Sequence, residues 1–209
     1  MRKKYMSKRA AMTADEVEKS SKKVVDSLIR IFGSGDFETV LAYYPLGNEV
    51  DVTGFIEWCW ERGVEVGLPK VKNTVNSVSG KMGDMCFYRI DSFAQLSKGT
   101  FNVMEPVEGV PVISLIRSKM NRAVDAEGCA KEGDRSTEVF VEEKTLVATP
   151  GVVFDREGGR MGYGKGYYDR FFNAHPGLFK VGCAHPCQLA PHIELQPHDV
   201  RLDAIATGD

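Results

Sequence analysis

The chain has 209 residues, of which 43% are hydrophobic and 27% charged, and its formal net charge at pH 7 is -2. These values are ordinary for a globular domain, and the near-zero charge gives no electrostatic basis for binding nucleic acid or an anionic membrane. No apolar run approaches bilayer-spanning length, and polar residues follow the basic start, so no secretory signal is expected. Five cysteines, an odd number, argue against a disulfide framework and favour a reducing compartment. We therefore expect one cytoplasmic domain over residues 1–209.

The sequence predicts helices and strands that alternate along the chain. Taken in order, the expected elements are a helix over 2–12, a second helix after a capping box at Thr13–Glu16, a turn at 33–35, strands over 39–44, 64–66, 85–90 and 146–148, a helix over 51–62 ended by Gly63, and a helix after Asp169. Such alternation predicts an α/β fold, with a largely parallel, Rossmann-like sheet covered by helices on both faces. Ligands of these sheets bind at the carboxyl ends of the strands. Residues 44–49 and the stretch after Ala148 both follow strands, so we expect them to face one crevice.

A glycine-rich stretch lies between Gly151 and Asp169, with five glycines within residues 158–166. Glycine frees backbone N–H groups to turn toward an anion, and the N-terminus of the following helix adds positive potential. Lys165 and Arg160 supply charges suited to phosphate oxygens, and the Asp169 carboxylate is suited to a divalent cation. The spacing matches neither a P-loop, where Gly166 would be Ser or Thr, nor the dinucleotide-binding motif. The alternative is a flexible surface loop, which would need none of these charged and aromatic residues.

This stretch resembles the signature of the 5-formyltetrahydrofolate cyclo-ligase family, also called 5,10-methenyltetrahydrofolate synthetases. The resemblance rests on Phe154-Asp155 and on the run from Gly159 to Arg170, and three further segments extend it to most of the chain. These segments are residues 2–13, 43–51 and 198–207. The resemblance implies a three-layer α/β/α fold. Between about 112 and 140 the sequence departs from the family pattern, and we interpret this range as an insertion in the single domain.

The resemblance implies ATP- and Mg²⁺-dependent cyclisation of 5-formyltetrahydrofolate to 5,10-methenyltetrahydrofolate, with release of ADP and phosphate. Phosphorylation turns the formyl oxygen into a good leaving group, and N10 of the folate then attacks the activated carbon. Such chemistry needs positioning and charge neutralisation more than a protein nucleophile, and the sequence has no nucleophile elbow. ATP is then the co-substrate and Mg²⁺ the cofactor, and we expect a monomer that binds small molecules only.

The family's functional residues map onto matching positions of this sequence. The catalytic residues are expected to be Lys165 and Arg160. Contacts to ATP are expected from Arg2, Arg160, Gly162, Gly164, Lys165, Gly166, Tyr167 and Tyr168. Contacts to the folate are expected from Tyr44, Glu49, Phe101, Tyr163, Gly164, Lys165, Gly166 and Tyr167. Asp169 and Asp203 are expected to hold Mg²⁺.

Several of these residues also have a plain structural interpretation. Glu49 taken alone is most often a solvated loop acid or a helix N-terminal charge, whereas the resemblance makes it the acceptor for pterin N–H groups. Tyr44 and Phe101 are core side chains first and walls of a folate site second. Residues 183–187, Cys-Ala-His-Pro-Cys, lack the second Cys/His pair that a zinc site needs, so a strand end in the core is favoured.

Two other functions remain as alternatives. One is a non-catalytic relative that binds folate or nucleotide, because the chain carries the insertion and lacks a family lysine upstream of Arg2. The other is a different activity on a similar sheet, such as sugar-phosphate isomerisation or acyl-coenzyme A transfer, for which ATP is irrelevant. ATP consumption that depends on 5-formyltetrahydrofolate distinguishes both from the ligase.

Overall fold

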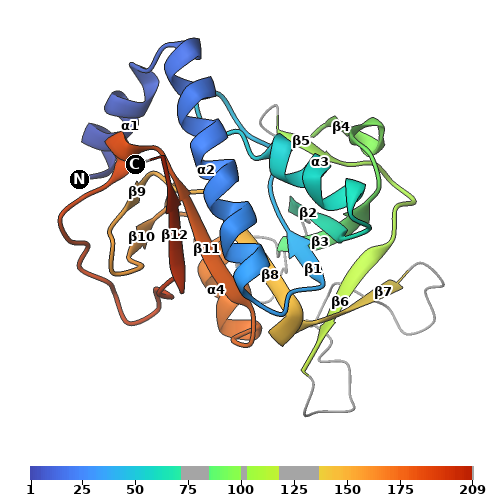
Figure 1. The fold of residues 1–209 in the computed structure, drawn as a ribbon. Helices are drawn as coiled ribbons and strands as arrows, with labels where there is room; N and C mark the ends of the chain where they lie inside the picture. The colour runs from blue at the N-terminus through green and yellow to red at the C-terminus, as the bar shows by residue number, and fades with distance from the viewer. Residues whose placement is uncertain (72–84, 100–102, 118–136, 209) are drawn as a thin grey trace.

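The computed structural model describes residues 1–71, 85–99, 103–117 and 137–208 (Figure 1). In this part of the chain the helices are α1 (Arg2–Ala10), α2 (Ala14–Ser34), α3 (Thr53–Glu61) and α4 (Tyr167–Ala174), with 3₁₀ turns η1 (Phe93–Gln95), η3 (Glu142–Lys144) and η4 (Pro186–Gln188). The strands are β1 (Thr39–Leu41), β2 (Glu65–Val71), β3 (Met85–Ile90), β4 (Leu96–Lys98), β5 (Met104–Pro106), β6 (Val112–Ile116), β7 (Thr137–Val141), β8 (Thr145–Thr149), β9 (Val153–Phe154), β10 (Arg160–Met161), β11 (Phe179–Ala184) and β12 (Ala204–Thr207). None of the described helices is long and apolar enough to cross a membrane.

Eight of the described strands form one sheet, in the order β12-β11-β8-β1-β2-β3-β6-β7. Strand β3 runs antiparallel to its two neighbours, β2 and β6. All other neighbouring strands in this sheet are parallel. The other described strands form two small antiparallel ribbons, β9 with β10 and β4 with β5. The prediction of a largely parallel sheet is therefore confirmed.

Side chains of the central strands alternate between two buried clusters, one on each face of the sheet. Val40 and Leu146 pack in the cluster that α2 and α3 cover. The next residues along each strand, Leu41 and Val147, pack in the cluster that contains Phe172 of α4. This period of two is what a strand buried on both faces requires. In Figure 1, α2 and α3 lie on the near side of the sheet and α4 lies behind it, so the three-layer architecture is confirmed.

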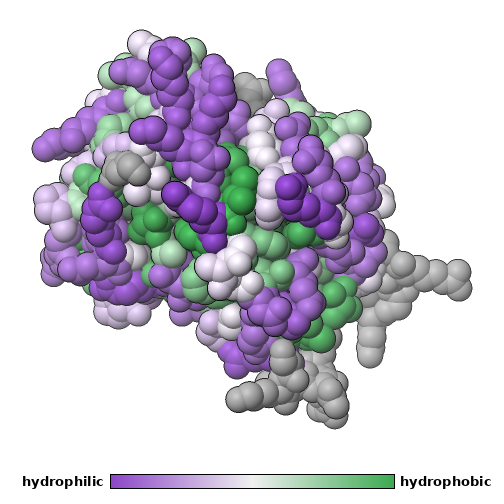
Figure 2. Space-filling model, viewed as in Figure 1, coloured by the Kyte–Doolittle hydropathy of each residue, from purple (hydrophilic) through white to green (hydrophobic). Residues whose placement is uncertain are grey.

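Helix α2 is fixed at both ends by its sequence. The predicted capping box is present, because the Thr13 hydroxyl accepts from Glu16 N–H at 3.3 Å and the Glu16 carboxylate accepts from Thr13 N–H at 2.8 Å. The turn predicted from residue 33 is wrong at its start, since the helix continues to Ser34. A side chain at Gly35 would lie 2.2 Å from the Phe37 ring, so only glycine fits where the chain leaves the helix. Figure 2 shows hydrophilic side chains along the outward face of this helix.

Several predicted elements differ from the structure in their bounds, by a residue or two at α1, α3 and β8 and by more at three others. Strand β1 ends at Leu41 rather than at residue 44, and α4 begins at Tyr167, before Asp169. Strand β2 is longer than predicted and continues through Gly67 and Pro69, which are weak strand formers. A side chain at Gly67 would lie 2.3 Å from Ile113, so tight packing across the sheet explains the glycine.

The range interpreted as an insertion contributes to the sheet at both of its ends. Strands β6 and β7 pair in parallel, with Ile113 opposite Glu138. Ile113 and Phe140 are buried in the cluster that contains Phe172. The middle of this range, residues 118–136, lies outside the described residues.

Candidate functional site

The segments expected to form the site leave the sheet from two neighbouring strands. β1 and β8 are parallel, with Leu41 opposite Val147. The chain leaves β1 through residues 42–49 and leaves β8 through the glycine-rich stretch, so both depart from the carboxyl edge of the sheet. The Tyr163 hydroxyl donates a hydrogen bond of 3.0 Å to the Glu49 carboxylate and joins the two segments. The expectation that they meet at one place is confirmed.

The first half of the glycine-rich stretch is a hairpin formed by β9 and β10 and organised by Asp155. This carboxylate is fully buried and accepts from the N–H groups of Glu157 at 3.0 Å, Gly159 at 2.7 Å and Ile193 at 2.7 Å. Gly158 has a φ of 87°, and a side chain there would lie 2.2 Å from the Leu202 carbonyl oxygen. The sequence reasoning gave Asp155 no role, although an aspartate followed by two glycines is typical of such a turn.

The second half of the stretch leads into the N-terminus of α4. Gly164 and Gly166 have φ values of 93° and 65°, the left-handed conformation that favours glycine. Arg2 on α1 donates from Nε to the Gly162 carbonyl at 2.7 Å, and its guanidinium lies 3.4 Å from the position of a Cβ on Gly164. The structure thus brings Arg2 to the loop, 160 residues away in sequence. Lys165 is exposed at the same place.

Arg160 and Asp169 form an ion pair inside the glycine-rich stretch. Arg160 Nη2 lies 2.9 Å from Asp169 Oδ2, and the guanidinium lies 5.4 Å above the Tyr168 ring. Arg160 is 7% exposed, and its Nε has no hydrogen-bond partner among the described residues. Asp169 also accepts from Val200 N–H at 3.3 Å. This pair links β10 to the first turn of α4 and to the C-terminal segment.

Asp203, the second expected metal ligand, is paired with Lys180. Its Oδ2 accepts from Lys180 N–H at 2.7 Å and lies 2.9 Å from Lys180 Nζ. Within the described residues, no group of three or more His, Cys, Asp or Glu side chains could hold a metal ion. The carboxylates of Asp169 and Asp203 contact basic side chains and backbone N–H groups.

Glu49 is a buried carboxylate with partners from three segments. One oxygen, Oε1, accepts from the Tyr163 hydroxyl and lies 3.6 Å from Arg9 Nη1, while Oε2 accepts from Leu46 N–H at 3.1 Å. Burial raises the pKa of Glu49, and the Arg9 charge and the Leu46 and Tyr163 hydrogen bonds oppose that rise. The interpretation of Glu49 as a solvated loop acid is wrong, since it is 6% exposed.

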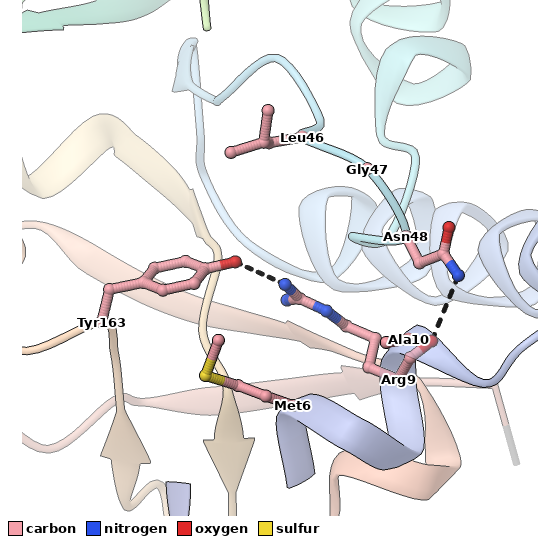
Figure 3. Close-up of a pocket in the computed structure, with 7 residues that line it drawn as sticks. All are labelled: Met6, Arg9, Ala10, Leu46, Gly47, Asn48 and Tyr163. Atoms are coloured by element: carbon pink, nitrogen blue, oxygen red, sulfur yellow. Dashed lines mark hydrogen bonds between the residues drawn. The ribbon is translucent and has the colours of Figure 1, made fainter. Parts of the chain in front are cut away.

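A pocket of about 320 Å³ opens beside this carboxylate (Figure 3). Its lining residues are Met6, Arg9, Ala10, Leu46, Gly47, Asn48 and Tyr163. In Figure 3 the Arg9 side chain extends from α1 toward the Tyr163 hydroxyl, with which it forms a hydrogen bond. The sequence reasoning gave Arg9 no role, because it was one of several basic residues on a helix expected to be solvated. The sequence feature that could have identified Arg9 is its spacing of seven residues from Arg2, which places both arginines on the same face of α1.

The aromatic residues expected at the site are distributed between core and surface. Tyr44 is partly buried and packs against the cluster under α2 and α3, with its ring 5.8 Å from Phe93. Tyr167 and Tyr168 are partly buried against the opposite cluster, and burial raises the pKa of Tyr168. Tyr163 is exposed at the pocket. Phe101 lies outside the described residues.

The Cys-Ala-His-Pro-Cys run at 183–187 ends a strand in the core, as favoured from the sequence. Cys183 is a buried free thiol at the end of β11, and burial raises its pKa to about 12. His185 is fully buried, and its Nδ1 lies 2.8 Å from the Ser20 hydroxyl. Cys59 and Cys187 are also free thiols. Cys86 is disulfide-bonded, so the expectation that the cysteines form no disulfides is wrong for this residue.

Comparison with known proteins identifies relatives across nearly the whole chain. The model of the 5-formyltetrahydrofolate cyclo-ligase family matches residues 115–208. A 5-formyltetrahydrofolate cyclo-ligase of Saccharomyces cerevisiae is 26% identical over 219 residues, covering 95% of this chain and 89% of the relative. The Escherichia coli K12 protein of the same name is 26% identical over 171 residues, covering 81% of this chain and 77% of the relative.

Solved structures of similar proteins agree with these sequence matches. The 5,10-methenyltetrahydrofolate synthetase of Aquifex aeolicus superposes with a TM-score of 0.71 at 30% identity, covering 99% of this chain and 87% of that one. A 5,10-methenyltetrahydrofolate synthetase from Mycoplasma pneumoniae has a TM-score of 0.64 at 20% identity, which supports the fold. With the glycine-rich stretch, the buried carboxylate and these relatives together, the chain belongs to the 5-formyltetrahydrofolate cyclo-ligase family.

Proposed function

We propose that this chain converts 5-formyltetrahydrofolate to 5,10-methenyltetrahydrofolate with ATP as co-substrate, releasing ADP and phosphate. The observation that carries the proposal is the contact between Glu49 and Tyr163. It joins a buried carboxylate suited to pterin N–H groups with a loop suited to phosphates, in a member of this family. Two substrates that must react with each other need such adjacent sites.

The reaction explains why the site needs cations and N–H groups rather than a nucleophile. The formyl oxygen of the substrate attacks the γ-phosphorus of ATP, and ADP leaves. N10 then attacks the formyl carbon and loses its proton, the C–O bond breaks, and inorganic phosphate departs with the former formyl oxygen and can take up that proton. Both steps develop negative charge on phosphoryl oxygens, which fixed positive groups stabilise.

Residues of the glycine-rich stretch supply these positive groups in our proposal. Lys165 is exposed beside the N-terminus of α4, where helix N–H groups favour an anion. Arg2 is tied to the same loop through Gly162 and supplies a further charge toward the phosphates. The backbones of Gly162, Gly164 and Gly166 approach the phosphates without steric hindrance from side chains. Tyr167 and Tyr168 flank the nucleotide.

Arg160 has two tasks in this proposal. Its ion pair with Asp169 fixes the hairpin against α4, and its Nε, which no described residue contacts by a hydrogen bond, leaves donor capacity for a phosphate oxygen. Because the guanidinium is buried, its charge is weakly screened by solvent, and the Asp169 carboxylate offsets part of it. We therefore keep Arg160 with Lys165 as the residues that stabilise charge during phosphoryl transfer.

Mg²⁺ would be held by Asp169 and Asp203, whose carboxylate oxygens are the hard ligands that this ion prefers. When bound, Mg²⁺ neutralises charge on the phosphates. Asp169 lies in the first turn of α4, beside the phosphate loop, and the ion would share its carboxylate with Arg160. Asp203 retains 38% side-chain exposure, and Lys180 is its competitor for Oδ2. Metal binding by Asp203 therefore requires sharing or displacing this ion pair.

The folate side of the site is formed by the residues after β1 and by Tyr163. Glu49 would accept from the amino and ring N–H groups of the pterin, in place of the Tyr163 hydroxyl that it accepts from here. Tyr44 and Phe101 would pack against the ring system. Tyr163 lies between two glycines, which give its loop the freedom to move aside. We further propose that the chain acts as a monomer, since one continuous sheet carries both segments.

The experiment that tests the proposal follows the near-ultraviolet absorbance of methenyltetrahydrofolate after mixing the protein with 5-formyltetrahydrofolate, ATP and Mg²⁺. We expect a rise in absorbance that needs all three components, with one ADP formed per product. Binding of 5-formyltetrahydrofolate without any product would instead identify a non-catalytic relative. Absence of folate binding would refute the proposed function altogether.

A further inference from the structure

Arg9 is a buried arginine for which the proposed reaction has so far given no task. It is 9% exposed and lies near the C-terminus of α1. Its Nη1 donates to the Gly151 carbonyl at 3.1 Å and lies 3.6 Å from Glu49 Oε1, and its Nη2 is hydrogen-bonded to the Tyr163 hydroxyl. Tyr163 in turn donates to the same Glu49 oxygen. Arg9, Tyr163 and Glu49 therefore form a closed triangle of contacts, which we call the Glu49 triad.

The helix that carries Arg9 is anchored at several points around this triad. Arg2, on the same face of α1 two turns earlier, donates to the glycine-rich stretch at Gly162. At the other end, the Asn48 amide donates to the carbonyls of Arg9 at 3.2 Å and Met12 at 3.0 Å. Asn48 directly precedes Glu49 in the chain. The position of the Arg9 guanidinium is thus fixed relative to the carboxylate.

Arg9 is the cation that faces Glu49 among the described residues. The other groups that face or influence this carboxylate from packed elements are the hydroxyls of Tyr163, Tyr43 and Tyr168, the Leu46 N–H and the His185 imidazole. Burial lowers the pKa of His185, which favours its neutral form. The single full positive charge within this set at neutral pH is therefore that of Arg9.

We propose that Arg9 is a positioning residue for folate binding, which holds the Glu49 carboxylate in place beside the pocket. The inference rests on the proposed function, because it assumes that Glu49 accepts from the pterin. Arg9 contributes in two ways. It fixes the direction of the carboxylate, and its charge offsets the burial that raises the pKa of Glu49.

The loss of Arg9 has a consequence that depends on pH. A buried carboxylate without its cation takes up a proton more readily, so the pKa of Glu49 rises further. Protonation turns one carboxylate oxygen into an O–H donor, so the group no longer accepts through both oxygens from the two N–H donors of a pterin, and folate affinity falls. Affinity should then recover as pH increases and the carboxyl group ionises. A residue that merely stabilises the fold would instead lower affinity equally at all pH values.

The test uses five variants of the full chain: Arg9→Met, Arg9→Lys, Glu49→Gln, the double variant of Arg9→Met with Glu49→Gln, and Lys3→Met as a control. Lys3 is an exposed basic residue on the same helix. Binding of 5-formyltetrahydrofolate is measured by isothermal titration calorimetry without ATP, at pH 7 and pH 8.5. The double variant removes both charges, so it keeps the test usable if Arg9→Met alone folds poorly.

We expect Arg9→Met to lower the affinity for 5-formyltetrahydrofolate at pH 7 by about tenfold or more. Between pH 7 and pH 8.5 the affinity of this variant should rise again by about tenfold. Arg9→Lys retains the charge, so its affinity should be the same at both pH values, as we expect for the wild type. Lys3→Met should bind as the wild type does. In the Glu49→Gln background, Arg9→Met should have no further effect, because its action passes through the carboxylate.

Two results would overturn the positioning role. They are a loss in Arg9→Met that is the same at both pH values, or an equal loss in the Glu49→Gln background. Neither result affects the proposed function if the wild type binds 5-formyltetrahydrofolate and Glu49→Gln binds it weakly. Failure of the wild type to bind would remove the proposed function and this inference together.

Discussion

The Asp155→Ala substitution is expected to destabilise the protein strongly, although Asp155 touches no substrate in the proposed reaction. Its carboxylate holds the β9–β10 hairpin through the N–H groups of Glu157 and Gly159, and holds the C-terminal segment through Ile193. Alanine removes all three acceptor contacts and leaves the N–H groups in place. Arg160 on β10 and the following phosphate loop lose their support as well.

The magnitude follows from the burial of these hydrogen bonds. The bonds from Gly159 and Ile193 are buried, and the bond from Glu157 is partly buried. Each buried N–H left without an acceptor costs about 1–3 kcal/mol, so the two buried groups give about 4 kcal/mol at the centre of the range. With a urea dependence of about 2 kcal/mol per molar, the unfolding midpoint should fall by about 2 M.

The assay is equilibrium unfolding in urea, followed by the fluorescence of the two tryptophans. The control is Glu157→Ala in the same hairpin, because the Glu157 side chain is 65% exposed and its ion pair with Arg201 is on the surface. We expect the control to change the free energy of unfolding by less than about 0.5 kcal/mol. A midpoint for Asp155→Ala within about 0.5 M of the control would refute the role given to this carboxylate.

Three further changes test the site itself. Lys165→Ala should lower turnover by about 100- to 1,000-fold in the absorbance assay while leaving the urea midpoint unchanged, because the lysine is exposed. Asp203→Asn should raise the Mg²⁺ concentration needed for half-maximal turnover, and a titration like that of the wild type would contradict the metal role. Burial raises the pKa of Glu49 in the folded state, so between the ordinary and the raised pKa the folded protein binds more protons, and stability falls as pH rises. Glu49→Gln should remove this slope from urea midpoints measured across that range, and an unchanged slope would show that other groups cause it.

The glycine-rich stretch shows how much of the site the sequence determines. Glycines that adopt positive φ, such as Gly164 and Gly166, and the cations among them are local properties of the chain. Their chemistry was therefore predictable as a phosphate loop. The hairpin within it was not predicted, although its turn signal is local, and the hydrogen bond from Ile193 to Asp155 depends on a residue far along the chain.

The sheet shows the same division. Short continuous apolar runs predicted that β1 and β8 are buried strands, since a strand covered on both faces needs apolar side chains on both. The length of β2 was not predictable from local propensity, because Gly67 and Pro69 are tolerated for tertiary reasons. The strands β6 and β7 were not predicted and lie at the ends of the range interpreted as an insertion. Their pairing could not be predicted, because the local sequence does not show which strands lie side by side.

By itself, the sequence of this protein determined the α/β class, the start of α2 and the residue types of a phosphate site, because periodicity, capping and glycine conformation act over a few residues. Only the tertiary structure decided which distant groups meet. It brought Arg9 to Glu49, 40 residues apart, and Tyr163 to both. A buried carboxylate and its cation are paired by the packing of α1 against two loops, and no local pattern encodes that contact. The buried charge at the pocket is therefore a property of the fold.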